Sequence, residues 1–199
     1  MSVFVSRLRA LAALAIVGFA LSACGYNTIP TLEEDAKAKW AEVENQYQRR
    51  ADLIPNLVAT VQGYANQEKE VLTAVTEARA KATAIHVDAS ELTDPDKIKQ
   101  LEDAQNALSG ALGRLLAVSE NYPDLKSNQN FLALQAQLEG TENRISVARR
   151  DYIASVQAYN TALRTFPGVL WASTAFRANK PMVEFTATSG AETPPKVKF

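Results

Sequence analysis

Two glutamates spaced three residues apart are the side chains in this sequence best placed for acid–base chemistry. Glu139 and Glu142 would share one face of a helix, where paired carboxylates can act as general acid and general base. Di-iron sites in helical bundles also need Glu-x-x-His pairs, and the one histidine, His86, lies in a segment without helical periodicity. We therefore predict no metal site and no cofactor.

The polar residues around these glutamates have a structural interpretation that we favour over catalysis. Charged and amide side chains beside an apolar helical face form hydrogen bonds and ion pairs between helices, which fix how the helices pack. The residues expected in such a network, or on a surface for a protein partner, are Arg49, Arg50, Glu139, Glu142, Asn143 and Arg144. The serines have no histidine on the same predicted surface, and the scattered glycines form no phosphate-binding loop. We predict that the protein is not an enzyme, and a hydrolase using Glu139 and Glu142 is the catalytic alternative.

Covalent chemistry is predicted at Cys24, the only cysteine. Residues 1–9 carry two positive charges, residues 10–21 are uncharged, and residues 21–24 read Leu-Ser-Ala-Cys. The first two features are typical of a secretory signal peptide, which is shorter than a bilayer span of about 20 residues. A cleaved signal or a short membrane anchor with an incidental cysteine is the alternative.

Residues 21–24 resemble a bacterial lipobox. In that class the thiol receives a diacylglycerol, the chain is cut before the cysteine, and the new amino terminus is acylated, for example with palmitate. We predict that residues 1–23 are removed and that lipid on Cys24 holds the protein to a membrane of the cell envelope, outside the cytoplasm. Gly25 then implies the periplasmic face of the outer membrane if the cell has two membranes.

Charge and length limit what the processed chain can bind. Removing Arg7 and Arg9 with the leader leaves 19 basic and 22 acidic residues, a net charge of −3. This balance gives no reason to bind nucleic acid. The remaining 176 or so residues can bury one core without disulfides or metals.

Apolar residues recur every three, four or seven positions from Leu32 to Val75, which predicts a first long helix over 31–84. Thr31 and Glu34 have capping-box spacing, so residues 24–30 are predicted to be only the lipidated cysteine and a short linker. The apolar phase continues through Pro55, which predicts a kink in one continuous helix and not a break.

Two further long helices are predicted after a loop over 85–93. Asp94 and Pro95 have the residue types of an N-cap and a first helical position, and this second helix should end near Tyr122. Ser127 is the expected cap of a third helix that runs to Phe166. Its apolar positions alternate steps of three and four, as in coiled-coil seams.

The predicted fold is all-α, an elongated antiparallel bundle of three long helices over 31–185. A short C-terminal helix is expected over 169–176 and a disordered tail over 186–199. Three antiparallel helices would place this tail away from the lipid anchor. Gly140, inside the third helix, predicts a close approach of a neighbouring helix.

Several blocks of the sequence resemble the signature of the LemA family. They are residues 46–58 (Gln-Tyr-Gln-Arg-Arg-Ala-Asp-Leu-Ile-Pro-Asn-Leu-Val), 122–126 (Tyr-Pro-Asp-Leu-Lys), 137–145 (Gln-Leu-Glu-Gly-Thr-Glu-Asn-Arg-Ile), 159–160 and 166–167. The chain departs from the family pattern at Ile153 and Ala175, where asparagine and glycine are common. The resemblance implies a membrane-anchored antiparallel helical bundle outside the cytoplasm, and it assigns no catalytic residue.

These observations predict a membrane-anchored lipoprotein that presents a helical bundle for protein–protein interaction or envelope organisation. Its expected partners are the membrane, through lipid on Cys24, and envelope proteins that the sequence does not identify. The alternative is an envelope sensor that binds a small ligand in the bundle core near Gly140 and Asn143.

Overall fold

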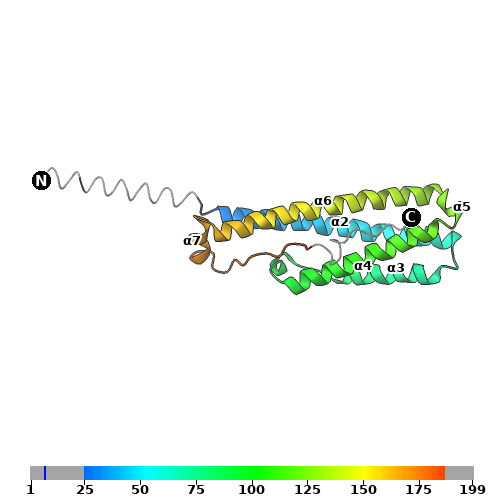
Figure 1. Cartoon of the computed structure of the whole chain (residues 1–199), viewed down its shortest axis with the longest axis horizontal. Helices are drawn as coiled ribbons and strands as arrows, with labels where there is room; N and C mark the ends of the chain where they lie inside the picture. The colour runs from blue at the N-terminus through cyan, green and yellow to red at the C-terminus, as the bar shows by residue number, and fades with distance from the viewer. Residues whose placement is uncertain (1–6, 8–24, 187–199) are drawn as a thin grey trace, which may run out of the picture.

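Four long helices dominate the computed structural model, which describes Arg7 and residues 25–186 (Figure 1). They are α2 (Thr28–Tyr64), α3 (Lys69–Ala84), α4 (Pro95–Ser119) and α6 (Gln129–Arg164). Shorter elements are the 3-10 helix η1 (Ala89–Glu91), α5 (Pro123–Lys126) and α7 (Gly168–Ser173). The predicted all-α bundle is confirmed. It is elongated, with α2 lying along α6 and α3 along α4 (Figure 1).

The prediction of one helix over 31–84 is wrong. The chain stays helical through Pro55 as expected, but α2 ends at Tyr64 and α3 returns beside it. Residues 66–70 are five consecutive polar residues, and they form the turn and the first residues of α3. The apolar spacing crosses this segment in one step of seven, from Ala65 to Leu72. The same step fits a continuous helix and a hairpin, so the spacing did not reveal the turn.

Two of the four long helices, α4 and α6, begin at a residue whose side chain caps the helix. Asp94 caps α4 as predicted, since its Oδ1 accepts from the backbone N–H groups of Asp96 at 3.0 Å and Lys97 at 3.3 Å. The cap of α6 is Asn128, one residue beyond the predicted Ser127. α2 begins at Thr28, so Thr31 and Glu34 lie inside the helix and form no cap at its start.

The extra helix reverses the end of the bundle at which the last long helix finishes. With four long helices, α6 ends beside the start of α2, at what we call the root end, and the α4–α6 connection lies at the far end (Figure 1). Tyr26 packs against Trp171 and Phe176 there, with ring centroids 5.2 and 5.1 Å apart. The expectation that the last long helix ends away from the anchor is therefore wrong, whereas the expected position of the tail falls on residues 187–199 and stays a prediction. Residues 187–199 and Cys24 lie outside the described residues.

After α7 the chain runs back over the side of the bundle as an irregular segment, residues 177–186, which we call the strap. The Val183 N–H donates to the Leu92 carbonyl at 2.8 Å, and the Thr186 N–H donates to Glu102 at 3.1 Å. Val183 to Phe185 belong to this strap.

The buried residues form two apolar clusters. The root cluster is built from Ile29, Ala36, Trp40, Val43, Tyr47, Val87, Leu92, Ile98, Leu101, Ile145, Ala148, Tyr152, Val156, Tyr159, Leu163, Met182 and Phe185. The far cluster is built from Ile54, Leu57, Val61, Ala65, Leu72, Val75, Ala82, Leu108, Ala111, Leu112, Leu115, Leu125, Phe131 and Leu138. Most of the apolar positions predicted for the third helix are buried in one cluster or the other.

Candidate functional site

Arg50 is the centre of a polar layer that connects α2, α4 and α6. Its side chain is only 2 % exposed. Its Nη1 donates to Ser109 Oγ at 2.8 Å and to Glu142 Oε1 at 2.7 Å. Its Nη2 donates to the backbone carbonyl of Gln105 at 3.4 Å and also to that residue's side-chain oxygen. A buried charge of this kind is tolerated because several acceptors converge on it.

This layer separates the two apolar clusters. On α2, Tyr47 belongs to the root cluster and Ile54 to the far cluster, with Arg50 between them. On α4, Leu101 and Leu108 flank Gln105 in the same way. A polar layer at one level restricts how the helices can slide past one another, because a shift in register would leave the guanidinium without acceptors.

The other residues predicted for a network or a partner surface lie outside this layer. Arg49, Glu139, Asn143 and Arg144 are exposed, and Glu139 accepts a hydrogen bond from Gln135 on its own helix at 3.0 Å. The predicted set therefore divides into one ion pair, between buried Arg50 and partly exposed Glu142, and four surface residues.

The close helix approach expected at Gly140 is absent. A Cβ on Gly140 would meet only the Arg144 guanidinium of its own helix, at 3.6 Å. No neighbouring helix requires a glycine at this position.

A second pair, which the sequence analysis missed, lies on the root side of the Arg50 layer. Arg149 Nη2 on α6 donates to Glu102 Oε1 on α4 at 2.8 Å, and the guanidinium lies 4.3 Å from the centre of the Phe185 ring. The backbone N–H and the hydroxyl of Thr186 also donate to Glu102. This pair therefore fastens the end of the strap to α4 and α6.

Glu102 and Gln105 had a sequence signal that was not used. They lie on the buried side of α4 together with Ile98 and Leu101. A polar residue in phase with an apolar stripe is either paired inside the bundle or costly to bury. Arg50 occupies the same kind of position on α2 and Arg49 does not, which distinguishes the two arginines.

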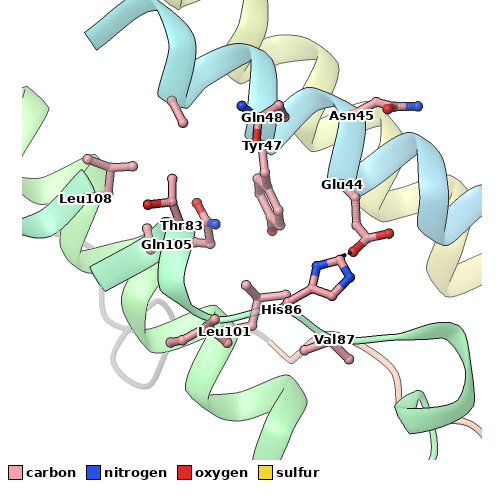
Figure 2. A pocket seen from close by; sticks show the side chains of 13 residues that line it. Glu44, Asn45, Tyr47, Gln48, Thr83, His86, Val87, Leu101, Gln105 and Leu108 are labelled. Carbon is pink, nitrogen blue, oxygen red and sulfur yellow. Dashed lines mark ion pairs between the residues drawn. The ribbon is translucent and has the colours of Figure 1, made fainter. Parts of the chain in front are cut away.

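A pocket of about 220 Å³ opens beside Tyr47, between α2, α4, the last turn of α3 and the segment that follows it (Figure 2). Glu44 and His86 face each other on one side of it, with 3.6 Å between Oε1 and Nδ1 (Figure 2). Apolar residues, among them Leu101 and Leu108, form another part of its wall. The ring of Tyr47 points from α2 into this space (Figure 2). Its hydroxyl is buried and has no hydrogen-bond partner within the described residues.

Burial perturbs two acids that line this pocket. It raises the pKa of the Tyr47 hydroxyl, and the nearby Arg149 and Arg50 oppose part of that shift. It also raises the pKa of the Glu44 carboxyl, which the nearby His86 opposes. The pocket therefore combines a neutral buried hydroxyl with a carboxyl group at its rim.

Two other hollows concern the predicted surface residues. A groove of about 500 Å³ lies between α4 and α6, with Leu112 and Leu138 among its apolar walls and Glu139, Glu142 and Asn143 also lining it. This groove is where the sequence placed a ligand, although Gly140 does not line it. A hollow of about 350 Å³ lies between α2 and α6, and its lining residues are Glu42, Asn143, Arg144, Val147, Ala148 and Asp151.

The geometry gives Glu139 and Glu142 separate partners. Glu142 accepts a hydrogen bond from the Arg50 guanidinium, and Glu139 accepts one from the Gln135 amide on its own helix. Within the described residues, no three His, Cys, Asp or Glu side chains lie close enough together to hold a metal ion.

Comparison with known proteins places the chain in a family. The model of the LemA family matches residues 39–199. The chain belongs to the LemA family. The blocks that resemble the family signature, residues 46–58 and 137–145, contain Arg50 and Glu142, so the ion pair between buried Arg50 and partly exposed Glu142 joins the two blocks.

Curated relatives of this LemA-family chain include two kinds of protein. Magnetosome protein MamQ 2 of Paramagnetospirillum magneticum is 30% identical over 180 residues, which cover 82% of this chain and 66% of the relative. MamQ of Magnetospirillum gryphiswaldense is 30% identical over 71% of this chain and 58% of the relative. Protein LemA of Metamycoplasma hominis is 32% identical over 59% of this chain and 49% of the relative. The chain thus spans two thirds or less of the length of these relatives.

In the part of the chain that the structure describes, no helix is both long enough and apolar enough to cross a bilayer.

Proposed function

We propose that this chain is a membrane-anchored lipoprotein that presents its helical bundle to protein partners of the cell envelope, without catalysis. The single observation that supports this most is the direct start of the bundle after the lipobox-like residues 21–24. α2 begins at Thr28, four residues after Cys24, and the corner between α6 and α7 packs against Gly25 and Tyr26. Lipid on Cys24 would therefore hold the root end of the bundle at the membrane and leave the far end exposed to partners.

The relatives support an association with membranes. Two of them are named as magnetosome proteins, and the family resemblance implies an anchored bundle outside the cytoplasm. For this chain we propose the cell envelope as the location, and the periplasmic face of the outer membrane in a cell with two membranes.

Substitution of Cys24 tests the anchor. We expect the wild-type protein to sediment with membranes and to incorporate labelled palmitate, and Cys24→Ser to lose both properties. Ser22→Ala, which keeps a small residue two positions before the cysteine, is the matched control and should retain them. A wild-type protein without label, or a Cys24→Ser protein that stays on membranes, would contradict lipid anchoring.

The hollow between α2 and α6 is the surface that we propose for a protein partner. Asn143 and Arg144 line it and are exposed, and Val147 beside them is 45% exposed. Interfaces combine an apolar centre with arginine and polar residues at the rim. The Arg50–Glu142 pair lies outside the lining of this hollow and would support the surface by holding α6 against α2.

Crosslinking on intact membranes tests this surface. We expect Arg144→Glu to reduce recovery of crosslinked partners severalfold, because a charge reversal at an interface opposes association. Lys99→Glu is the matched control, since Lys99 is an exposed base on α4 and its own ion pair is with Asp103 on the same helix. Equal recovery from both variants would argue against the proposed surface.

A small-ligand sensor is the second candidate function, and the Tyr47 pocket favours it. A buried hydroxyl without a hydrogen-bond partner is costly, and a ligand oxygen or nitrogen could supply that partner. The apolar wall suits a small body with one polar group, since a cavity of about 150 Å³ can hold a benzene-sized molecule.

A thermal-shift screen of small polar compounds tests the sensor. A ligand of this pocket should raise the melting temperature of the wild type and leave Tyr47→Phe unchanged. Asn130→Ala, on the exposed surface at the far end, is the control and should respond like the wild type. A ligand that stabilises Tyr47→Phe equally would bind elsewhere.

A further inference from the structure

We propose that the corner between α6 and α7 is a second membrane contact, which inserts its apolar side chains into the bilayer surface beside Cys24. This inference rests on the proposed lipid anchor and adds to it a contact made by the folded protein. It concerns a part of the molecule about 140 residues later in the sequence than the anchor.

The corner exposes an unusual concentration of large apolar side chains. Phe166 is 79% exposed, Leu170 52%, Tyr26 43% and Val169 39%. They are four of the seven exposed large apolar residues recorded for the described part of the chain, and they lie together at the root end. Exposed apolar residues that cluster in this way mark a binding surface, whereas single ones need no explanation.

The position of these residues favours a bilayer as the occupant. Tyr26 follows Cys24 by two residues, a span of at most about 7 Å. A cysteine held at the headgroups by its lipid therefore brings Tyr26 to the membrane surface. Tyr26 packs edge-on against Trp171, so the corner comes to the membrane with it.

Close packing makes the corner a fixed part of the root end. A Cβ on Gly25 would lie 2.6 Å from Pro167 Cγ, and a Cβ on Gly168 would lie 2.0 Å from the Ala162 carbonyl oxygen. Both glycines are therefore needed for the approach of the chain start to the corner and of the corner to α6. The corner cannot swing away from the membrane without breaking these contacts.

Charge around the corner matches a membrane with anionic lipid. From residue 152 to residue 183 the sequence contains Arg164, Arg177 and Lys180 and no acidic residue. All three bases are exposed. Near the start of α2, Glu33 and Glu34 each form an ion pair with Lys37 at 2.8 Å, and Asp35 is exposed. Aromatic residues with bases beside them are typical of protein segments at the membrane interface.

A second copy of the chain fits this surface poorly. Two copies joined through their root ends would place both Cys24 residues at one interface and point the bundles in opposite directions. Two such bundles could not both stand on the same membrane surface. A bilayer accepts the corner and the lipid of Cys24 from the same side.

Tryptophan quenching in vesicles tests the contact with the full, lipidated chain. The protein is reconstituted into phosphatidylethanolamine–phosphatidylglycerol vesicles that contain phospholipid brominated on its acyl chains, and tryptophan emission is measured. Trp171 lies in the corner, whereas Trp40 is 1% exposed and about 18 Å along α2 from Thr28 at 1.5 Å per residue. We expect bromine to quench the Trp171 share of the emission and to spare the Trp40 share.

Three variants separate the contact from the anchor. Trp171→Phe should lose the quenchable emission. Phe166→Ser/Leu170→Ser should lose most of the quenching, and Leu132→Ser, which changes a residue 42% exposed at the far end, should keep it. Circular dichroism melts check that each variant is folded, and flotation with the vesicles reports the anchor separately.

Each outcome decides between the two proposals. Loss of quenching in the double variant, with flotation retained, supports the corner contact. A wild-type protein that floats without quenching, or a double variant that is quenched like the wild type, overturns the contact and leaves the anchor standing. A wild-type protein that does not float overturns the anchor and, with it, this inference.

Discussion

The far half and the root half of the bundle cover their buried apolar side chains in different ways. In the far half, α2, α3, α4 and α6 all contribute to a cluster in which aliphatic side chains predominate. In the root half, α2 and α6 run on while the other two long helices stop short, and the strap and the segment around η1 cover the exposed side (Figure 1). Helices cover one half, and irregular chain covers much of the other.

Covering the root half with irregular chain explains why polar aromatic side chains are buried there. A buried irregular segment must find hydrogen-bond partners that a helix supplies to itself. In the root half those partners are side chains: Trp40 Nε1 donates to the Val87 carbonyl and the Tyr152 hydroxyl to the Val183 carbonyl, both at 3.0 Å. The far half needs few such contacts. The Arg50 layer lies at the boundary between the two arrangements.

The largest effect is expected from a truncation in the far cluster. Leu115 on α4 is fully buried there, and Leu115→Ala should lower the free energy of unfolding by about 2–5 kcal/mol because it leaves a cavity. Urea unfolding measures the loss, and Leu170→Ala, at a residue 52% exposed, is the control with an expected change within about 0.5 kcal/mol. Hydrogen exchange then shows whether the root half opens together with the far half. A loss below about 1 kcal/mol would mean that the far cluster does not dominate stability.

Next in size is the effect of removing the boundary arginine. Arg50→Ala should cost about 2–4 kcal/mol, because it leaves a cavity and removes the donor from Gln105 and Ser109. Glu142→Ala should cost less, about 1 kcal/mol, since the Glu142 side chain is 43% exposed and water can replace part of the interaction. Urea unfolding of both single variants and of the double variant gives their coupling. A Glu142→Ala loss as large as that of Arg50→Ala would show that the ion pair, and not the filled space, holds the boundary.

A smaller and more local effect is expected where the strap is attached. Asn160 on α6 donates to the Met182 carbonyl and accepts from its N–H, both at 2.9 Å. Asn160→Ala breaks both bonds, which should cost about 1–3 kcal/mol and free the strap before the helices open. Trypsin should then cut faster after Arg177, the base in the strap that proline does not follow. Gln135→Ala, which removes an exposed hydrogen bond within α6, is the control. Unchanged cleavage in Asn160→Ala would show that other contacts hold the strap.

Features that depend on residues close in sequence could be predicted, and features that depend on distant packing could not. The α6 seam, the Asp94 cap and the passage of α2 through Pro55 depend on residues within a few turns of one another, and the structure has all three. The turn after Tyr64 does not follow from local residues. Its polar residues 66–70 tolerate helix or turn, and the packing of α3 on α4 decides between them. That one turn changed the number of long helices and therefore the end at which α6 finishes.

The candidate site shows the same limit. Arg50 and Glu142 could be named as network residues from their place beside apolar stripes, but their pairing joins residues 92 positions apart. The Tyr47 pocket depends on how the segment after α3 meets α2 and α4, so its residues share no sequence motif. Glu102 was missed although its position on the buried side of α4 signalled an interior partner.

Two tyrosines of the root cluster give the smallest predicted effect and the finest test of the comparison. The Tyr152 hydroxyl donates a hydrogen bond to the Val183 carbonyl of the strap. The buried Tyr47 hydroxyl has no hydrogen-bond partner among the described residues. Tyr152→Phe should therefore cost about 1 kcal/mol at neutral pH, and Tyr47→Phe should change stability by less than about 0.5 kcal/mol. A loss above about 1 kcal/mol in Tyr47→Phe would show that its hydroxyl is hydrogen-bonded in solution.

At alkaline pH the wild type should lose more of its stability than Tyr47→Phe loses. Burial holds the pKa of Tyr47 above its ordinary value, so the folded protein keeps a proton that the unfolded chain releases near pH 10. The folded state then binds more protons than the unfolded state, and the free energy of unfolding falls as the pH rises past about 10. Tyr47→Phe removes this contribution, so urea unfolding at about pH 11 should show a smaller loss from its neutral value than the wild type shows. Equal losses would mean that the Tyr47 hydroxyl ionises in the folded protein as easily as in the unfolded chain, and that the pocket beside it is open to water.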